Sequence, residues 1–258
     1  MITKDGISRC LREKVDVVVY DELVSTNLTA KELAEGISSD TLIVAKRQSG
    51  GRGRMGRSFF SPDGGLYMSL LIHPQLTAQK AVGLTAAAAV CAARAIDRVS
   101  GKESQIKWVN DIYLDGRKVC GILTEAQIKD DGFMKYAVVG VGVNLTVPDG
   151  GFPADIADRA GAVFGTDMPQ DSDNRIAAEI VNELMVMCRQ GLNISDCLDE
   201  YRRRSNIIGR DVDVIRYVGG ESRPAKAVAI DSEYRLVVRY SDGTEEALGS
   251  GDVSVRQG

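Results

Sequence analysis

The sequence predicts an α+β protein with a small β-barrel at its C-terminus. Through the first 206 residues, apolar and β-branched runs of strand length alternate with segments of helical spacing. After Asn206 the pattern changes to short alternating strands separated by turn residues. We therefore predict two domains: a mixed β-sheet packed with helices over residues 1–206, and a barrel over residues 207–258.

Strand patterns mark the first quarter of the chain. Runs of β-branched and other apolar residues, bounded by loop residues, are typical of strands. By this criterion we expect strands at Val15–Tyr20, Thr41–Lys46 and Leu66–Ile72. A loop rich in glycine and arginine separates the second of these strands from the third.

Two helices are expected in the same region. The pattern at Leu28–Glu35 is short; it is entered through Ser25-Thr26-Asn27 and ends at Gly36. The Ala-rich stretch Gly83–Ile96 predicts a buried helix, with Thr77 as its N-cap. Because this stretch is too short to span a bilayer, we expect no membrane segment.

A hairpin is expected in the middle of the chain. Asp115-Gly116 is a strong tight-turn signal, so the extended segments on its two sides should pair. These segments are Gln105–Val109 and Ile112–Leu114 before the turn and Arg117–Ala126 after it. A further strand is expected at Tyr136–Leu145, and helices at Arg175–Gln190 and Asp196–Arg204. The basic run Arg202–Arg204 is expected to be a solvated helix C-terminus.

The predicted barrel consists of short strands and frequent turns. Strands are expected at Asp211–Tyr217, Ala225–Ile230, Arg235–Tyr240 and Val253–Arg256. The turns between them are expected at Gly219-Gly220, Asp231-Ser232, Asp242-Gly243 and Gly249–Gly251.

The composition excludes several kinds of site. The formal net charge is −4, so the chain as a whole offers no positive field to a nucleic acid or an anionic membrane. His73 is the single histidine, which excludes multi-histidine metal sites and leaves a Ser-His-Asp triad dependent on one imidazole. The five cysteines are odd in number and contain no C-x-x-C pair, which favours a reducing, cytoplasmic environment over a disulfide framework.

Positive charge is concentrated in one short segment. Thr41–Pro62 contains five lysines and arginines and no acidic residue. Its centre is the arginine loop, Ser49-Gly50-Gly51-Arg52-Gly53-Arg54-Met55-Gly56-Arg57. Glycines allow backbone N–H groups to approach an anion, and arginines donate forked hydrogen bonds to phosphate or carboxylate. We therefore predict an anion site here; the alternative is a flexible, solvated loop.

Two known phosphate-binding motifs match this loop in letters. Gly51, Gly53 and Gly56 fit G-x-G-x-x-G, and Gly51–Ser58 nearly fits a P-loop with Arg57 in the lysine position. Both motifs must open a helix, whereas Phe59-Phe60-Ser61-Pro62 is not a helix start. We therefore expect neither motif to form.

A second cluster of polar residues surrounds the predicted hairpin. It comprises Lys107-Trp108-Val109-Asn110-Asp111 and the segment Asp115–Leu123, which contains Lys118. Amide and carboxylate oxygens suit a magnesium ion that carries phosphates, and lysines suit phosphate or carboxylate charge. Taken alone, the segment is equally consistent with a surface hairpin whose tryptophan packs in the core.

Taken together, these segments resemble the biotin protein ligases, enzymes that adenylate biotin and attach it to a lysine of a carrier domain. The G-R-G-R-x-G-R signature is present at Gly51–Arg57, and K-W-P-N-D is present at Lys107–Asp111 with Val109 in place of proline. The G-x-G-x-N strand is present at Gly140–Asn144, and order and spacing agree from about Val15 to Leu145. The resemblance implies a class II synthetase-like catalytic domain and an SH3-like C-terminal barrel.

The resemblance also implies roles for individual residues. Catalysis would involve Lys118, Arg52, Arg54 and Asp111, with Asp111 also the candidate magnesium ligand. Biotin would be bound by Ser25, Thr26, Asn27, Gln48, Gly51, Arg52, Gly53, Arg54, Lys118, Gly121 and Gly140. The nucleotide would be bound by Arg54, Arg57, Phe59, Lys107, Asn110, Asp111 and Asn144.

Structural explanations exist for some of these residues. Ser25, Thr26 and Asn27 can equally cap the helix that follows them. Phe59 can equally be a core residue. Val109 changes the local backbone restriction that proline would impose, but it removes no functional side chain.

The implied reaction suits these residue types. A carboxylate with an ordinary pKa of about 4.3 is ionised at neutral pH, so its attack on the α-phosphorus of ATP needs no general base. Arginine, lysine and Mg²⁺ bring the anions together and stabilise charge on the phosphoryl group. ATP and biotin are then the substrates, and the partner is a biotin carboxyl carrier domain of a biotin-dependent carboxylase. Because the adenylate must be protected from water, we expect residues 48–57 to be mobile without ligand.

Other functions stay open on the sequence alone. A lipoate or octanoyl transferase has a related architecture, and pocket selectivity is not readable from one sequence. A nucleic-acid-binding module would use the arginine loop and the barrel, but the segment from Asn206 carries nine acidic against seven basic residues. Only 24 residues precede Ser25, too few for a helix-turn-helix domain, so we expect a short form without direct DNA binding. The resemblance alone suggests a homodimer.

Overall fold

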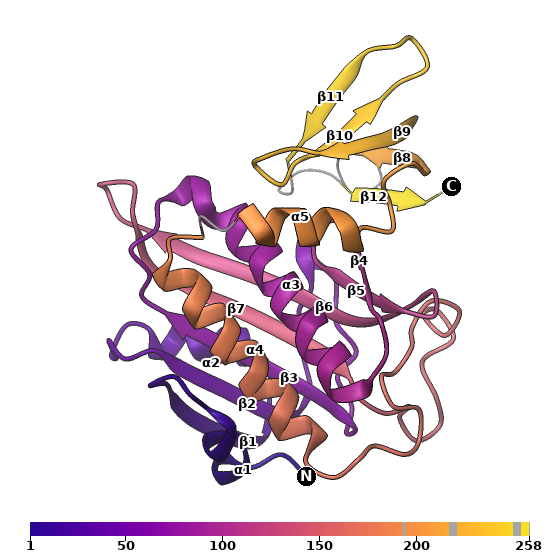
Figure 1. The fold of residues 1–258 in the computed structure, drawn as a ribbon. Coiled ribbons are helices and arrows are strands. Elements are labelled where there is room, and N and C mark those ends of the chain that lie inside the picture. The colour runs from indigo at the N-terminus through magenta and orange to yellow at the C-terminus, as the bar shows by residue number, and fades with distance from the viewer. Residues whose placement is uncertain (193–194, 217–220, 250–253, 258) are drawn as a thin grey trace.

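The computed structural model describes residues 1–192, 195–216, 221–249 and 254–257. Within these residues the larger sheet has seven strands in the order β1-β2-β3-β7-β6-β5-β4 (Figure 1). β1 and β2 are parallel and the other neighbouring pairs are antiparallel, so the sheet is mixed, as predicted. The strands are β1 (Asp16–Leu23), β2 (Thr41–Gln48), β3 (Gly65–Ile72), β4 (Gln105–Lys107), β5 (Asp111–Leu114), β6 (Arg117–Ile128) and β7 (Met134–Asn144).

Helices cover both faces of this sheet (Figure 1). α3 (Ala81–Ser100) and α4 (Ser172–Arg189) pack on each other and on one face, whereas α2 (Thr26–Leu33) packs against β2, β3 and β7 from the other. Successive side chains of β2 point to opposite faces of the sheet and so contribute to two cores. Leu42 belongs to the core beneath α3 and α4, and Ile43 belongs to a smaller core beneath α2. This arrangement confirms the predicted α+β class.

Two features of the helices differ from the prediction. An N-terminal helix, α1 (Lys4–Cys10), has no counterpart among the predicted elements; a cap at Thr3 and a fully buried Ile7 stabilise it despite its central glycine. Thr77 is not the N-cap of the long helix. It precedes a separate 3₁₀ turn, η2 (Ala78–Lys80), and α3 begins only after that turn.

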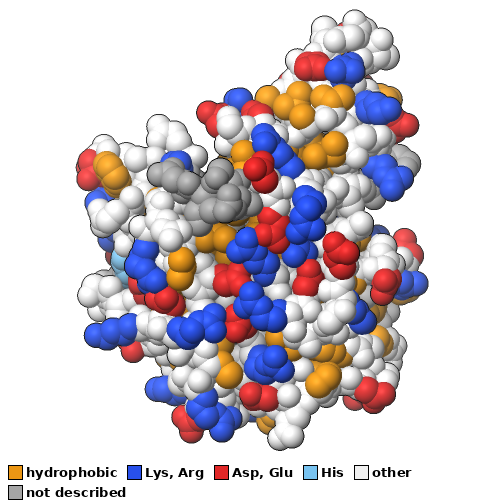
Figure 2. All heavy atoms as spheres, in the orientation of Figure 1, with side chains coloured by type: hydrophobic (Ala, Val, Ile, Leu, Met, Phe, Trp, Pro, Cys, Tyr) orange, Lys and Arg blue, Asp and Glu red, His pale blue; other side chains and the backbone are white. Residues whose placement is uncertain are grey.

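The basic end of α5 (Ser195–Arg204) is only partly solvated: Arg203 is exposed, as predicted, whereas Arg204 is not. Arg204 is buried, and its guanidinium lies 2.6 Å from a carboxylate oxygen of Asp97 and 2.8 Å from one of Glu200. Arg94 of α3 donates to Glu200 as well, over 2.8 Å. Figure 2 shows positive and negative side chains interleaved over the face formed by α3, α4 and α5. Tertiary ion pairs therefore replace the solvent that the sequence pattern suggested.

The C-terminal residues form a second, antiparallel sheet in the order β11-β10-β9-β8-β12 within the described residues. This sheet is compatible with the predicted small barrel. Its strands are β8 (Asp211–Ile215), β9 (Ser222–Ile230), β10 (Leu236–Arg239), β11 (Glu245–Leu248) and β12 (Ser254–Gln257). β11 is absent from the prediction because its Glu-Glu-Ala-Leu sequence has low β propensity. The predicted turns at Gly219-Gly220 and Ser250-Gly251, together with Val253, lie outside the described residues.

Two hydrogen bonds, one from α5 and one to the turn between β9 and β10, hold the segment Lys107–Asp111 in place. The indole Nε1 of Trp108 donates to the carbonyl oxygen of Tyr234 over 2.9 Å, and the tryptophan is 5% exposed. The hydroxyl of Tyr201, on α5, donates to the carbonyl oxygen of Val109 over 3.0 Å. Trp108 therefore packs in the core, and the boundary between residues 206 and 207 stays a prediction. In the part of the chain that the structure describes, no helix combines the length and apolarity needed to cross a bilayer.

Candidate functional site

A cavity of about 960 Å³ lies on the sheet face that carries α2. Gly140 and Gly142 of β7 line it, whereas the preceding and following valines, Val139 and Val143, belong to the core beneath α3. The structure brings nearly all of the sequence-predicted site residues together around this cavity. They are Ser25, Thr26, Asn27, Gln48, Arg52, Gly53, Arg54, Arg57, Phe59, Lys107, Asn110, Asp111, Lys118, Gly121, Gly140 and Asn144.

Glycines form part of the cavity wall because a side chain would collide there. A Cβ atom at Gly140 would lie 2.0 Å from Oδ1 of Asn27. At Gly142 it would lie 2.6 Å from the ring of Phe59, and at Gly121 it would lie 3.1 Å from the same ring. Phe59 is half-buried and rests on these two glycines, so it lines the site and is not a core residue.

One end of the cavity is uncharged and rich in hydrogen-bonding groups. Gln48 Oε1 accepts from the backbone N–H of Thr26 over 2.8 Å and from its hydroxyl over 3.1 Å. Ser69 is fully buried, with its Oγ 2.6 Å from Oδ1 of Asn27 and 2.8 Å from Oγ1 of Thr26. Ser25 occupies the N-cap position of α2, but its side chain makes no capping hydrogen bond. Simple helix capping therefore does not account for these side chains.

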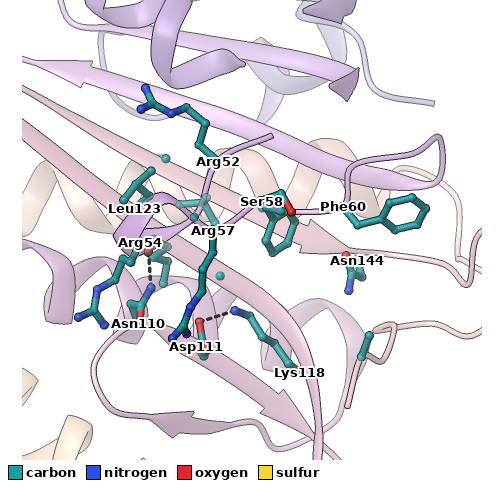
Figure 3. A pocket seen from close by; sticks show the side chains of 18 of the residues that line it. Arg52, Arg54, Arg57, Ser58, Phe60, Asn110, Asp111, Lys118, Leu123 and Asn144 are labelled. Carbon is teal, nitrogen blue, oxygen red and sulfur yellow. Dashed lines mark hydrogen bonds and ion pairs between the residues drawn. The ribbon is translucent and has the colours of Figure 1, made fainter. Parts of the chain in front are cut away.

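The other end of the cavity is charged. Lys118 Nζ lies 2.6 Å from Oδ1 of Asp111, and Nη1 of Arg54 donates to Oδ1 of Asn110 over 3.1 Å (Figure 3). Burial lowers the pKa of the Arg54 guanidinium, and the positive charge of Arg57 lowers it further, against the opposing effect of Asp111. A cation so poorly solvated is suited to binding an anionic ligand.

The arginine loop is a tight hairpin. Arg52 and Ser58 form an isolated antiparallel bridge, and the N–H of Gly53 donates to the carbonyl of Arg57 over 2.7 Å. Met55 and Gly56 make the turn at φ values of 55° and 72°. This single 3₁₀ turn, η1 (Arg54–Gly56), opens no helix, so neither the dinucleotide motif nor the P-loop forms.

The side chains of the arginines in this hairpin point in two directions. Figure 3 shows the side chains of Arg54 and Arg57 extending toward Asn110 and Asp111, whereas that of Arg52 points away from them. The sequence prediction treats these arginines as one group, because the direction of each side chain depends on the turn. Arg52 is exposed in this arrangement.

Gly51 is the one predicted site residue that does not line the large cavity. A Cβ atom there would lie 2.3 Å from the carbonyl oxygen of Phe59 and 2.5 Å from Oγ of Ser61. The residue instead lines a second cavity of about 370 Å³ on the other side of the arginine loop, together with Leu123 and Glu125.

A segment after β7 also lines the large cavity, although no motif or periodicity in its sequence indicates a role there. Phe152, Ile156 and Arg159 are among its lining residues. The backbone N–H of Lys118 donates to the carbonyl of Arg159 over 2.7 Å, and Nδ2 of Asn144 donates to the carbonyl of Gly161 over 3.0 Å. The segment lacks helical or strand periodicity, so its sequence indicates only a loop.

Comparison with known proteins supplies a family. Residues 21–144 match the biotin/lipoate A/B protein ligase family. The bifunctional ligase/repressor BirA of Bacillus subtilis is 36% identical over 174 residues, which are 67% of this chain and 52% of that protein. A biotin–[acetyl-CoA-carboxylase] ligase of Mycobacterium tuberculosis is 28% identical over 93% of this chain and 88% of its own length. The chain thus spans about half the length of the Bacillus relative.

Solved structures agree on the fold. The biotin protein ligase of Aquifex aeolicus, determined in complex with biotin and ATP, superposes with a TM-score of 0.76 at 24% identity. The match covers 94% of this chain and 99% of that one. Both the mixed sheet and the C-terminal sheet therefore belong to a fold already seen with this pair of ligands.

Proposed function

Because this chain belongs to the biotin/lipoate A/B protein ligase family, we propose that it is a biotin protein ligase. It forms biotinyl-5′-AMP from biotin and ATP, then transfers biotin to a lysine of a biotin carboxyl carrier domain. One observation carries the proposal: a single cavity joins an uncharged, hydrogen-bonding end at Thr26 and Gln48 to a cationic end at Arg54 and Lys118. The first end suits the ring urea of biotin, and the second suits its carboxylate and the phosphates of ATP.

In the first step a biotin carboxylate oxygen attacks the α-phosphorus of ATP, and pyrophosphate leaves. The attacking group is already an anion, so the protein needs no base; it must overcome the repulsion between two anions. Lys118 is placed to pair with the carboxylate in exchange for Asp111. Arg54 and Arg57 are placed to stabilise negative charge on the phosphoryl oxygens.

Magnesium fits this site as an ion carried mainly by the phosphates. The described residues contain no group of three or more His, Cys, Asp or Glu side chains that could hold a metal ion. Asp111 offers one carboxylate at the cationic end, which is the donor set expected where phosphates supply the other ligands. The ion would neutralise charge on the phosphates, and Asp111 would be its protein ligand.

In the second step the neutral amine of the carrier lysine attacks the carbonyl carbon of the mixed anhydride. The C–O bond to phosphate breaks, AMP leaves with the bonding electrons, and the amine loses a proton to form the amide. Before this step the adenylate must be kept from water. The arginine loop and the segment containing Phe152 and Ile156 border the cavity from different elements and are placed to cover it.

The rival acyl substrates fit this cavity less well. Lipoate and octanoate carry no hydrogen-bonding groups at the end remote from the carboxylate, so Thr26, Asn27 and Gln48 would face an apolar group. Burial of their remaining hydrogen-bonding capacity against an apolar group disfavours such substrates. A nucleic-acid module is also disfavoured, because Arg54 and Arg57 turn into the cavity (Figure 3).

The proposed partner is a carrier domain of a biotin-dependent carboxylase, the substrate class named for several relatives. A reducing cytoplasm is the proposed compartment, since all five cysteines, each within the described residues, are free of disulfides. Homodimer formation and the absence of DNA and membrane partners stay predictions; sedimentation with and without biotin and ATP would measure the oligomeric state.

Pyrophosphate release tests the proposed activity. The purified chain is incubated with Mg-ATP and, in parallel, with biotin, lipoate or octanoate. We expect release that depends on biotin and is absent with the other acids. Release with lipoate or octanoate but not with biotin would show that the chain is a ligase for a different acid.

A further inference from the structure

The side-chain amide of Asn27 is held on both sides at the uncharged end of the large cavity. Its Nδ2 donates to Oε2 of Glu125 over 2.9 Å and to the carbonyl of Leu123 over 3.3 Å. Its Oδ1 lies 2.6 Å from the hydroxyl oxygen of Ser69. Asn27 is 4% exposed, so its orientation matters to every group packed around it.

Glu125 makes the shorter of the two contacts that decide which way this amide faces. An ionised carboxylate and a backbone carbonyl only accept hydrogen bonds, so the amide nitrogen must point toward Glu125 and Leu123, and the amide oxygen toward Ser69. Since Oδ1 in turn only accepts, the proton that bridges it to the buried Ser69 comes from the Ser69 hydroxyl. The carboxylate, together with the Leu123 carbonyl, thereby sets the direction of hydrogen bonding at two polar groups.

Strand register places Glu125 close to the site but outside the large cavity. Gly140 of β7 pairs with Ser69 of β3 on one side and with Leu123 of β6 on the other. Glu125 lies two residues beyond Leu123, on the same face of β6. It lines the smaller cavity beneath the arginine loop and is not among the residues of the large one.

Lys31 keeps Glu125 anionic. Its Nζ donates to Oε1 of Glu125 over 2.7 Å. Burial raises the pKa of the Glu125 carboxyl, but the hydrogen bonds from Lys31 and Asn27 and the charges of Lys31 and Arg52 outweigh burial. The pKa therefore lies below its ordinary value, and the carboxylate remains an acceptor at neutral pH.

We propose that Glu125 is a positioning residue for substrate selection: it fixes the Asn27 amide, and through it the Ser69 hydroxyl, in the arrangement that matches a ring urea. The inference rests on the proposed function and deepens it. Glu125 touches neither substrate; it acts through Asn27. A pocket end with a fixed hydrogen-bonding direction discriminates against an acyl group that has no polar end.

The test is Glu125→Gln, which keeps the shape but lets residue 125 either donate or accept. We expect the KM for biotin in biotin-dependent pyrophosphate release to rise about 10-fold, with kcat and the KM for ATP little changed. The selectivity ratio, defined as the inhibition constant of lipoate against biotin-dependent release divided by the KM for biotin, should fall about 10-fold. The matched control is Glu35→Gln, because Glu35 is exposed and also pairs with a lysine, Lys135, over 3.0 Å; its constants should equal those of the unsubstituted chain.

Two further measurements separate positioning from structure. In a double-mutant cycle with Asn27→Ala, Glu125→Gln should add no further loss, because Glu125 acts through that amide. Should Glu125→Gln fail to fold, Lys31→Gln weakens the same anchor and is expected to raise the biotin KM about 2–3-fold.

An unchanged biotin KM and an unchanged selectivity ratio in whichever variant folds would overturn this inference and leave the proposed function intact. An unsubstituted chain that uses lipoate in preference to biotin would overturn the proposed function, and this inference with it.

Discussion

At the scale of single residues, the ion pair between Lys118 and Asp111 occupies the cationic end of the cavity. In the proposed reaction, the carboxylate of biotin replaces Asp111 as the partner of Lys118. Lys118 Nζ and Asp111 Oδ1 are 2.6 Å apart, and the Lys118 ammonium lies 5.8 Å from the centre of the Phe59 ring. A carboxylate ligand can take the place of Asp111 beside the lysine, which frees the aspartate for a phosphate-bound magnesium ion. In this account the lysine controls the rate of adenylate formation.

Lys118→Ala should slow adenylate formation about 100-fold at saturating biotin and ATP, because the cation that offsets the developing repulsion is lost. Rapid-quench measurement of biotinyl-5′-AMP in a single turnover gives this rate. Lys135→Ala is the control, since Lys135 pairs with exposed Glu35 away from the cavity. An unchanged single-turnover rate in Lys118→Ala would contradict the role given to this lysine.

Site residues could be predicted from the sequence where they belong to motifs whose residue types suit a particular chemistry. The clusters at Gly51–Arg57 and Lys107–Asp111 concentrate charged and glycine residues in short windows, and the cavity joins them. Ser69 and Glu125 carry no such signal. Their importance comes from strand register, which sets Ser69 and Leu123 on either side of Gly140, and register is not visible in a single strand pattern.

At the scale of elements, the arginine loop is the part of the site that should move. Its hairpin directs Arg54 and Arg57 toward Asn110 and Asp111 and Arg52 away from them, and both Arg52 and Arg57 are exposed (Figure 3). Bound adenylate would supply anionic partners for these side chains and order the loop over the intermediate.

Trypsin cleavage after the loop arginines should be slowed at least several-fold when biotin and Mg-ATP are both present, because the ordered loop no longer fits a protease site. Mass spectrometry of timed digests locates each cut. Cleavage after Arg235, in the turn between β9 and β10, serves as an internal control and should not change. Equal cleavage of the loop with and without both substrates would rule out ligand-dependent ordering.

Most elements were predicted from their sequence patterns, including short strands such as β5 and β10. The long strands of the larger sheet and the helices α3 and α4 have extended apolar patterns. α1 and β11 were missed because they are short and polar, and tertiary packing stabilises them. The segment with Phe152 and Ile156 has no periodicity, and hydrogen bonds to β6 and β7 hold it beside the cavity.

At the scale of the whole molecule, buried ion pairs join α5 to the remainder of the catalytic domain. The side chain of Arg204 is 8% exposed and contacts Asp97 and Glu200. Burial raises the pKa of Glu200, but the hydrogen bonds and charges of Arg94 and Arg204 outweigh burial and lower it. Because the folded-state pKa is lowered, this stabilisation is present at neutral pH and is lost on acidification through that lowered pKa.

Arg204→Leu should lower the free energy of unfolding by about 2–3 kcal/mol at neutral pH, because the partly buried Asp97 loses its cationic partner and the carbonyl of Ser104 loses a donor, whereas Glu200 keeps Arg94. Chemical denaturation measures this difference. Arg203→Leu is the matched control on the same helix; Arg203 is 60% exposed, and its loss should change the free energy by less than about 1 kcal/mol. Equal effects of the two substitutions would mean that burial of Arg204 contributes nothing.

Contacts from α5 and from the turn between β9 and β10 also bear on function. Tyr201 and Tyr234 bond to the backbone and indole of the segment Lys107–Asp111, which lines the cavity through several of its side chains. The sequence indicates a separate C-terminal element, but it does not indicate these contacts, because they join residues more than ninety positions apart. The C-terminal element therefore helps to position the segment Lys107–Asp111 through the carbonyl of Tyr234, which accepts from Trp108.

The most direct test of the central claim is the mass of the acceptor. The full chain is mixed with biotin, Mg-ATP and a biotin carboxyl carrier domain, and the intact mass of the carrier is then measured. A carrier whose acceptor lysine is replaced by arginine, and a mixture without ATP, are the controls. We expect the carrier to gain the mass of one biotinyl group only in the complete mixture. An unmodified carrier, with no biotinyl-5′-AMP bound to the enzyme, would contradict the proposed ligase activity.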